Sequence, residues 1–244
     1  MKVLGVIPAR FASSRFPGKP LIDIKGKTMI RRVFEGAAKS LLIEDVVVAT
    51  DDQRIIDEVL SFNGNAVMTS KTHPSGTDRC AEVAARYPDC DIVINIQGDE
   101  PLVDYRQLEQ LISAFSDPSV EIATLVTRKT TMDDLQNPNR IKVVADHEMN
   151  ALYFSRSVVP NFHHTTGDVL GNYPFLRHIG LYAYRASILQ KLTSLEPTAL
   201  EKTESLEQLR WLYHGHKIRL VVTEIETPNI DVPEDLQKVL EQLG

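Results

Sequence analysis

The chain has 244 residues, a formal net charge of −6 at pH 7 and a pI near 5.7. With 43% hydrophobic and 25% charged residues it has the composition of an ordinary soluble globular protein. The acidic balance argues against bulk nucleic-acid binding, which usually needs a basic surface, and no apolar run approaches the ~20 residues that cross a bilayer. Pro8 and Arg10 interrupt the N-terminal segment, so we expect no signal peptide, no membrane anchor and a cytoplasmic location. Cys80 and Cys90 are expected to be inert thiols rather than a disulfide framework or a metal site.

Apolar runs rich in β-branched residues alternate with helical stretches in the first half of the chain. The runs at 3–7, 46–49 and 92–96 predict strands, while apolar residues at helical spacing over 29–38 and 55–60 predict helices between them. Nearly continuous apolar strands alternating with amphipathic helices indicate a parallel sheet covered on both faces. The sequence therefore predicts an α/β fold whose ligand site lies beyond the carboxyl ends of the strands.

The second half has a different pattern. The stretches IKVVAD (141–146), ALYFSR (151–156) and RHIGLYAYR (177–185) predict strands of an antiparallel or mixed region. The stretch ESLEQLRWL (204–212) predicts a helix with Leu206, Leu209 and Leu212 on its buried stripe. Residues 158–174, rich in turn formers, are expected to be a flexible loop with solvated His163 and His164. No repeat or linker is evident, so we expect a single domain.

The stretch VIPARFASSRFPGKP (6–20) directly follows the first predicted strand. It places three cations, Arg10, Arg15 and Lys19, among small residues on an acidic protein. Arginine forks and a mobile lysine charge suit phosphate oxygens, and neither of the two familiar glycine-rich phosphate signatures is present. A solvated basic loop is the alternative, but it leaves three cations at a strand end unexplained. The loop predicts a site for a triphosphate.

Carboxylates follow another predicted strand. In NIQGDEP (95–101), Asp99 and Glu100 come after Gly98, and a carboxylate that faces a phosphate loop is the expected ligand of Mg²⁺. Plain turn chemistry explains the same residues if no phosphate loop lies opposite. Asp231, in NIDVPEDL, is either a second metal carboxylate or the N-cap of a C-terminal helix.

Two further groups of residues have the character of a binding site. In SGTDR (75–79), Ser75 or Thr77 is expected to cap a helix, and Arg79 has the reach to contact a base or ribose. Polar and charged side chains on the second-half elements suit a polyhydroxylated, acidic small molecule, although each of them is as compatible with a surface or core position. They are Arg156, Arg177, His178, Tyr182, Glu207 and Gln208.

These motifs, in order and over nearly the whole chain, resemble the 3-deoxy-manno-octulosonate (Kdo) cytidylyltransferase family. The opening loop is shared by several sugar nucleotidyltransferases, while QGDEP, ALYFSR, RHIGLYAYR and LEQLR together are more specific. The resemblance implies a Rossmann-like nucleotide-diphospho-sugar transferase core with a mostly parallel sheet and a smaller mixed α/β dimerisation part. Within the single domain 1–244, it implies a nucleotide-binding half at 1–125 and a sugar-binding and dimerisation half at 126–244.

The resemblance also implies a reaction. CTP and Kdo, with Mg²⁺, give CMP-Kdo and pyrophosphate for lipopolysaccharide biosynthesis, and the enzyme is expected to be a homodimer. By match to the family's motifs, the catalytic residues are Arg10, Lys19, Asp99 and Asp231, and Asp99 and Asp231 bind the metal. The implied nucleotide-binding residues are Pro8, Ala9, Arg10, Ser13, Arg15, Lys19, Ser75, Gly76, Arg79 and Gln97. The implied sugar-binding residues are Gln97, Arg156, His178, Tyr182, Glu207 and Gln208.

Three alternatives remain open at this point. The same reaction on 8-amino-3,8-dideoxy-manno-octulosonate differs at one terminal substituent, and nothing in the sequence excludes it. Another nucleotidyltransferase, making CMP-sialic acid or a guanylylated hexose, is disfavoured by the second-half motifs. A non-catalytic nucleotide-binding regulator is disfavoured because both Asp99 and Asp231 are present.

Overall fold

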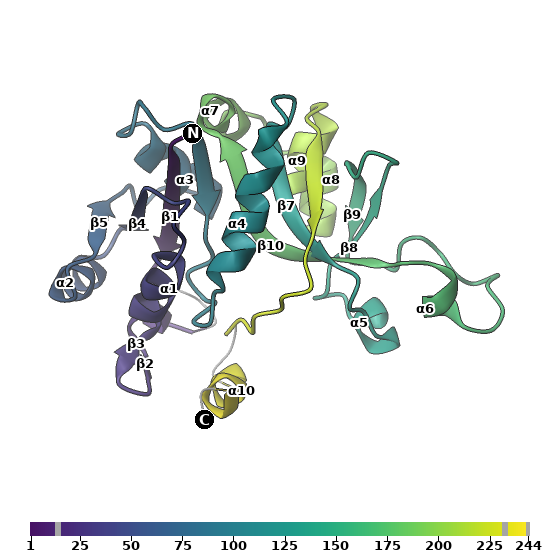
Figure 1. Cartoon of the computed structure of the whole chain (residues 1–244), viewed down its shortest axis with the longest axis horizontal. Helices are drawn as coiled ribbons and strands as arrows, with labels where there is room; N and C mark the ends of the chain where they lie inside the picture. The colour runs from purple at the N-terminus through teal and green to yellow at the C-terminus, as the bar shows by residue number, and fades with distance from the viewer. Residues whose placement is uncertain (13–15, 231–233, 243–244) are drawn as a thin grey trace.

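A single sheet organises the chain. The structure, a computed structural model, describes residues 1–12, 16–230 and 234–242. Within them nine strands form one sheet, in the order β11-β7-β10-β6-β1-β4-β5, with β8 paired to β10 and β9 paired to β8 (Figure 1). The strands are β1 (Val3–Ala9), β4 (Asp45–Thr50), β5 (Asn65–Met68), β6 (Ile92–Asn95), β7 (Ile122–Thr127), β8 (Lys142–Ala145), β9 (Ala151–Ser155), β10 (Leu176–Arg185) and β11 (Ile218–Val222); a separate ribbon pairs β2 (Asp23–Ile24) with β3 (Lys27–Thr28).

One strand of the main path runs against the others. β1 is parallel to β4 and β6, β4 is parallel to β5, and β7 is parallel to β11. β10 lies between β6 and β7 and is antiparallel to both. Its first residues therefore lie at the edge of the sheet where β6 and β7 end. The fold is α/β with a mostly parallel sheet, as the apolar runs predicted.

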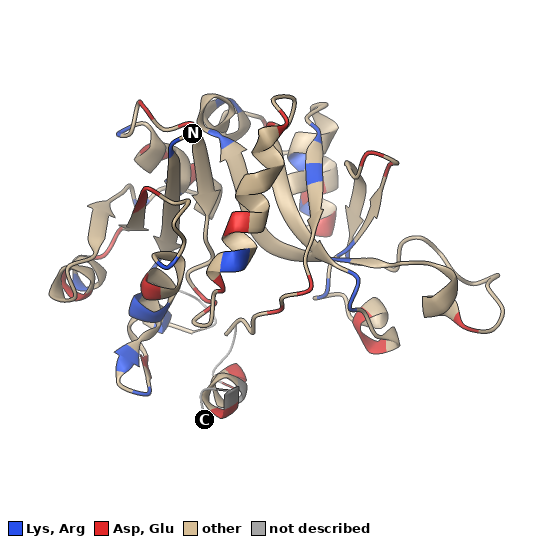
Figure 2. Ribbon diagram, viewed as in Figure 1, with Lys and Arg blue, Asp and Glu red and all other residues tan. Residues whose placement is uncertain are grey.

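Helices cover both faces because alternate residues of each central strand point to opposite sides. Val3 and Ile7 of β1 pack with α1 (Met29–Ala37), α2 (Gln53–Ser61) and α4 (Tyr105–Ser113), and Val239 of α10 (Asp235–Gln242) joins this cluster. Leu4 and Val6 pack with α3 (Gly76–Ala84), α7 (Ala186–Thr193) and α9 (Gln208–Tyr213). The ribbon of β1 has no charge colour in Figure 2, and β6 likewise contains no charged residue, which agrees with the burial of both strands on both faces.

The remaining elements are short. η1 (Lys19–Leu21) and η2 (Ala114–Ser116) are 3₁₀ turns, and α5 (Met132–Gln136), α6 (Val169–Asn172) and α8 (Ala199–Glu204) are small helices. The hairpin β8–β9, α5 and α6 lie together at one end of the sheet and correspond to the smaller mixed part that was expected (Figure 1). Within 158–174, α6 is the one regular element among the described residues, and His163 and His164 are exposed as predicted.

One predicted helix is wrong in its extent. Instead of a continuous helix over 204–212, α8 ends at Glu204, Ser205 adopts a left-handed conformation with φ 52°, and α9 begins at Gln208. The break follows from the Glu204 carboxylate, which accepts hydrogen bonds from Ser155 Oγ at 2.8 Å and from Arg156 N at 2.9 Å and so ties the end of α8 to β9. Of the predicted buried stripe, Leu206 and Leu209 are buried, and Leu212 is half-buried against the same core.

The two sequence halves share this sheet. β10, from the second half, is inserted between β6 and β7 of the first half. Cys80 and Cys90 are free thiols, as expected. No helix in the described ranges has both the length and the apolar character that a membrane span requires.

The first prediction concerns the packing of α1 on the segment before α4. A Cβ at Gly36 would lie 2.6 Å from Val103 Cγ1 and 2.8 Å from the Val103 carbonyl oxygen. We expect Gly36→Ala to lower the free energy of unfolding by about 1–3 kcal/mol through overpacking, although alanine has the better helix propensity by ~1 kcal/mol. Urea unfolding measures the change. An unchanged or higher stability would show that α1 and the Val103 segment separate freely.

Candidate functional site

The ends of β1 and β6 meet at the point where the strand order reverses. From β1 the chain adds β4 and β5 on one side and then returns to place β6 on the other. Ile96 N donates to the Val6 carbonyl at 2.8 Å, and a Cβ at Gly98 would lie 2.8 Å from the Pro8 carbonyl oxygen. Only glycine allows this approach. The loop after β6 therefore lies directly beside the start of the cationic loop, in the crevice where open α/β sheets bind ligands.

Lys19 and Asp99 form an ion pair in this crevice. Lys19 Nζ lies 2.9 Å from Asp99 Oδ2 and also donates to the Ile230 carbonyl at 2.8 Å, while Ile230 N donates to the Asp99 carbonyl at 2.9 Å. The structure thus brings together two of the predicted catalytic residues from positions 80 apart in sequence. Asp231 directly follows Ile230 in the chain, but it lies outside the described residues, as do Ser13 and Arg15.

The C-terminal segment is also held through Glu100. Thr227 Oγ1 donates to Glu100 Oε2 at 3.0 Å, and Gln107 Nε2 donates to the Ile225 carbonyl at 2.9 Å. Burial, and secondarily the neighbouring Asp99 carboxylate, raise the pKa of Glu100 to about 8. Glu100 is next to the predicted metal ligand Asp99 in the sequence. In the structure the Glu100 side chain contacts the segment that leads to position 231.

A cavity of about 370 Å³ opens next to Asp99. Its wall combines the loop after β6, the first residues of β10, the start of α9, residues 139–141 and residues 226–229. Of the predicted sugar-binding residues, it is lined by Gln97, His178, Tyr182 and Gln208. Arg140 and Arg177 add two cations to the wall; Arg177 is one of the residues with binding-site character in the sequence, and Arg140 is not. Arg140 lies in the segment NPNR, whose sequence is typical of an ordinary turn.

A bulge in β10 shapes this cavity. The pairing of β10 with β7 shifts register between Ile179 and Tyr182. Gln97 Nε2 donates to the Gly180 carbonyl at 2.8 Å and Thr124 Oγ1 donates to the Leu181 carbonyl at 2.7 Å, so both carbonyls of the bulge are satisfied. Bulges commonly re-aim side chains beside active sites. Here the bulge lies between two residues that face the cavity, His178 and Tyr182.

Three buried polar atoms of cavity-lining residues have no hydrogen-bond partner among the described residues. They are Gln208 Nε2, Tyr182 Oη and Arg177 Nε, and the residues Gln208 and Tyr182 are only 6% and 7% exposed. A buried polar group without a partner is unfavourable by about 1–3 kcal/mol. Such atoms in the wall of a cavity are a signal for a polar ligand, because a bound hydroxyl supplies the missing partner.

His178 is half-buried in the cavity wall and carries a neutral imidazole. Its ring packs edge-on to Phe154 with 5.1 Å between centroids and against Tyr182 at 5.3 Å, and its Nε2 lies 3.0 Å from Thr124 Oγ1. Removal from water lowers the pKa of His178 to about 3. At neutral pH the ring therefore offers one donor and one acceptor but no charge.

The SGTDR segment begins α3 beside the end of β1. Ser75 is the N-cap, because its Oγ accepts from Asp78 N at 3.2 Å, so the capping interpretation is confirmed. A Cβ at Gly76 would lie 3.3 Å from Pro8 Cγ. Arg10 donates from Nη2 to the His73 carbonyl just before this helix. The predicted nucleotide residues of both segments are thus adjacent.

Hydrogen bonds to other parts of the protein engage three predicted site residues that do not line the cavity, Arg79, Glu207 and Arg156. Arg79 has 0% exposure and donates to Asp51 Oδ2 at 2.9 Å and to Thr69 Oγ1. Glu207 accepts from Thr77 Oγ1 at 2.8 Å, and burial raises its pKa. Arg156 donates to the carbonyls of Pro138, Glu204 and Ser205 at 3.0, 2.7 and 3.3 Å, and so ties together two segments whose next residues, Asn139 and Leu206, line the cavity.

The donor set suits a metal that arrives with phosphate. No group of three or more His, Cys, Asp or Glu that could hold an ion occurs within the described ranges. Mg²⁺ usually takes one or two carboxylates together with substrate phosphates and water rather than a full protein cage. Asp99, whose side chain is 27% exposed at the edge of the cavity, fits as a carboxylate ligand of this kind.

The fold and the site are those of a nucleotidyltransferase. The sheet is mostly parallel, a cationic loop follows its first strand, a carboxylate follows the strand at the reversal point, and a polar cavity lies beside them. Comparisons with known proteins narrow this class. A family model described as cytidylyltransferase matches residues 4–218. A 3-deoxy-manno-octulosonate cytidylyltransferase of Geobacter metallireducens is 47% identical, covering 100% of this chain and 98% of that protein, and one of Parabacteroides distasonis is 48% identical, covering 98% and 97%.

A solved structure of CMP:2-keto-3-deoxy-manno-octonic acid synthetase complexed with CTP superposes with a TM-score of 0.92 at 41% identity, covering 100% of this chain and 98% of that one. At 15% identity, a 4-diphosphocytidyl-2C-methyl-D-erythritol synthase structure from Anaerococcus prevotii superposes with a TM-score of 0.65 and shares the fold. The chain belongs to the 3-deoxy-manno-octulosonate cytidylyltransferase family.

A second prediction follows from the neutral imidazole. Because the folded pKa of His178 lies below the unfolded value near 6.5, the unfolded chain binds a proton that the folded chain excludes. The stability contributed by neutral His178 is full above pH 6.5 and is lost as pH falls from 6.5 toward 3, by about 1.4 kcal/mol per pH unit. We expect ring ¹⁵N shifts of His178 to stay neutral from pH 5 to 8, and a His178→Gln variant to lose less stability than the wild type between pH 6.5 and 5. A ring titration with a midpoint above 5 would contradict this.

Proposed function

We propose that this chain transfers CMP from CTP to the anomeric hydroxyl of Kdo, giving CMP-Kdo and pyrophosphate. The family membership supports the nucleotide and the type of reaction, and the names of the relatives specify Kdo. One observation of the structure carries the assignment of the sugar acid. The cavity beside the Lys19–Asp99 pair combines unpartnered buried polar atoms with two arginines, which suits an anionic ligand with several hydroxyls.

The chemistry is an in-line displacement at phosphorus. The anomeric oxygen of Kdo forms a bond to the α-phosphorus, the bond from that phosphorus to the oxygen bridging to the β-phosphate breaks, and the hydroxyl proton passes to water. Phosphoryl transfer of this kind needs positioning and neutralisation of charge more than covalent participation by the protein. Arg10 and Lys19, at the end of β1 and in η1, are placed to neutralise the triphosphate and the departing pyrophosphate.

The sugar acid is oriented by the cavity. Tyr182 Oη and Gln208 Nε2 are available for its hydroxyls, and neutral His178 is a further donor or acceptor. Arg140 and Arg177 supply positive charge for its carboxylate; Arg177 is already paired with Glu226, and Arg140 Nε lies 3.6 Å from Asp134 Oδ1. The same wall carries the carboxylates of Asp99, Glu100 and Glu226, so the preference for a sugar acid over a neutral hexose is supported by the names of the relatives.

Mg²⁺ is the proposed cofactor, with Asp99 as its carboxylate ligand and Asp231 as the second. When bound, the ion would neutralise phosphate charge and lower the pKa of a coordinated hydroxyl. In the structure Lys19 forms an ion pair with Asp99. The proposed enzyme is a cytoplasmic homodimer, and its product enters lipopolysaccharide biosynthesis. The family resemblance supports the location, the homodimer and the pathway.

The third prediction tests the carboxylate. Asp99→Asn keeps an acceptor for Lys19 but removes the charge that holds a cation, so we expect kcat to fall at least ~100-fold with an unchanged unfolding midpoint. Pyrophosphate release from CTP, Mg²⁺ and Kdo measures the rate. The matched control is Asp57→Asn, which removes an exposed carboxylate on α2. Near-wild-type turnover of Asp99→Asn at saturating Mg²⁺ would remove Asp99 from the metal site.

The fourth prediction tests the sugar cavity. Gln208→Met replaces a buried amide whose nitrogen has no partner by an apolar side chain of similar shape, so we expect the unfolding free energy to stay level or rise by up to about 1 kcal/mol. The KM for Kdo should rise roughly tenfold while that for CTP changes little. An equal rise in the KM for Kdo and the KM for CTP would place Gln208 outside the sugar site.

The preferred acceptor is identified by a separate measurement on the wild type, which compares turnover of Kdo with turnover of its 8-amino analogue.

A further inference from the structure

The loop at residues 69–74, between β5 and α3, supports the guanidinium of Arg10. Arg10 Nη2 donates to the backbone carbonyl of His73, so the loop contributes main chain rather than a side chain to this contact. A guanidinium has five N–H donors in one plane. A fixed carbonyl that accepts from one of them sets the orientation of the other four.

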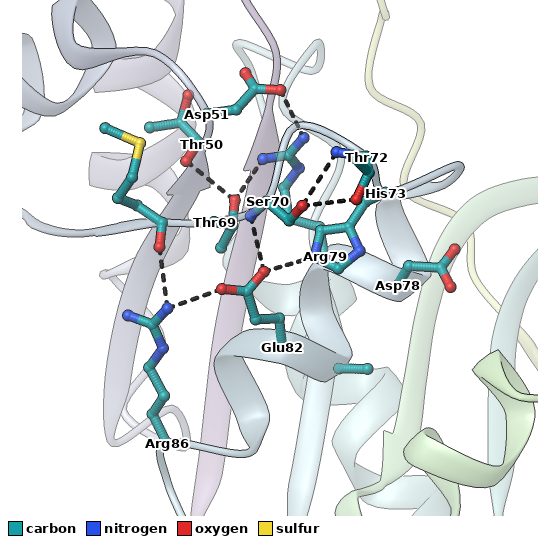
Figure 3. Close-up of polar contacts among 12 residues, drawn as sticks. Thr50, Asp51, Thr69, Ser70, Thr72, His73, Asp78, Arg79, Glu82 and Arg86 are labelled. Atoms are coloured by element: carbon teal, nitrogen blue, oxygen red, sulfur yellow. Dashed lines mark hydrogen bonds and ion pairs between the residues drawn. The ribbon is translucent and has the colours of Figure 1, made fainter.

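Glu82 of α3 holds this loop from one side (Figure 3). Its Oε2 lies 2.6 Å from His73 Nε2 and accepts from Ser70 N at 2.9 Å, so a single oxygen joins both ends of the loop. Its Oε1 accepts from Arg86 Nη2 at 2.8 Å, and the same Arg86 nitrogen donates to the Met68 carbonyl at 3.0 Å. The Ser70 amide is the largest cause of a lowered pKa for Glu82, which keeps the carboxylate charged.

Arg79, one turn earlier on α3, holds the loop from the other side. Its Nη1 donates to Thr69 Oγ1 and its Nη2 donates to Asp51 Oδ2 at 2.9 Å (Figure 3). Thr69 is itself fixed to β4, because its N and Oγ1 donate to the Thr50 carbonyl at 2.8 and 3.0 Å. Since Arg79 is wholly buried, its guanidinium acts on a nucleotide only through the loop that it holds.

We propose that Glu82 and Arg79 are positioning residues that fix the 69–74 loop so that the His73 carbonyl aims Arg10 at the triphosphate of CTP. This inference rests on the proposed use of CTP. Through these two residues α3 contributes to phosphate binding, and this contribution is separate from any contact of Ser75 or Gly76 with the nucleoside. Glu82 and Arg79 touch neither substrate, and their effect passes through Arg10.

The test is a double-mutant cycle between Glu82 and Arg10, read by calorimetric binding of CTP and of cytidine in the same Mg²⁺ buffer. Glu82→Ala is preferred to a change at Arg79, because loss of Arg79 leaves Asp51 without its cation and endangers folding. We expect Glu82→Ala to weaken CTP binding roughly tenfold, the loss of about one charged hydrogen bond, and to change cytidine binding less than about twofold. In an Arg10→Ala background the same change should weaken CTP binding less than about twofold.

Three variants sharpen the result. Glu82→Gln keeps an oxygen that accepts from both Ser70 N and His73, so it should restore CTP binding to within about threefold of the wild type. His73→Ala removes the ring contact without altering α3 and should show the same dependence on Arg10. Glu35→Ala is the matched control, because Glu35 on α1 pairs with Lys27 and Arg31 at comparable exposure and contacts no residue of the loop in the described structure. It should leave CTP binding unchanged.

Equal weakening of CTP and cytidine would overturn the proposal, because the loop would then serve the base. Independent, multiplicative effects of Glu82→Ala and Arg10→Ala would overturn it as well. Binding is measured without a sugar acid, so a wild type that binds CTP but does not turn over Kdo would contradict the proposed reaction and leave this inference standing. A wild type that does not bind CTP would overturn both.

Discussion

The contact between the ends of β1 and β6 is the constraint on which the rest of the site depends. Gly98 lets the loop after β6 approach the Pro8 carbonyl more closely than any residue with a Cβ would allow. That approach brings Asp99 within 2.9 Å of Lys19, and Lys19 in turn holds the carbonyl of Ile230. These contacts fix a charge from the start of the chain, a carboxylate from its middle and a segment near its end to one another.

The sequence predicted the layered fold and the meeting of Lys19 with Asp99, because both depend on local signals. Continuous apolar runs predict buried parallel strands, and cations or carboxylates directly after them have to lie at one edge of the sheet. Lys19 and Asp99 meet for this reason. The break at Ser205 was missed because it follows from a contact of Glu204 with β9, and the residues that make that contact lie about 50 positions apart.

For the sugar side the sequence indicated residue types, but not the contacts that these residues make within the protein. Arg79, Arg156 and Glu207 carry the chemistry of ligand-binding groups, and the resemblance placed them at the substrates, but their polar atoms are used to hold neighbouring segments. Arg140 faces the cavity although its local sequence carries no sign of it. Charge and hydrogen-bonding capacity are properties of a side chain, whereas the direction in which it points depends on the bulge in β10 and on loops that only the folded chain defines.

The place of β10 in the sheet has a consequence for the order in which the protein folds. β6 and β7 are complete once about half of the chain has been synthesised, yet the strand that separates them begins at Leu176. Until then β6 and β7 each present an unpaired edge, and their pairing with β10 requires contacts between residues that are 50 to 93 positions apart. Contacts of such range form slowly, and exposed strand edges invite association with other chains. The nascent chain is therefore most exposed to misassembly before β10, the strand that completes the cavity, has been inserted between β6 and β7.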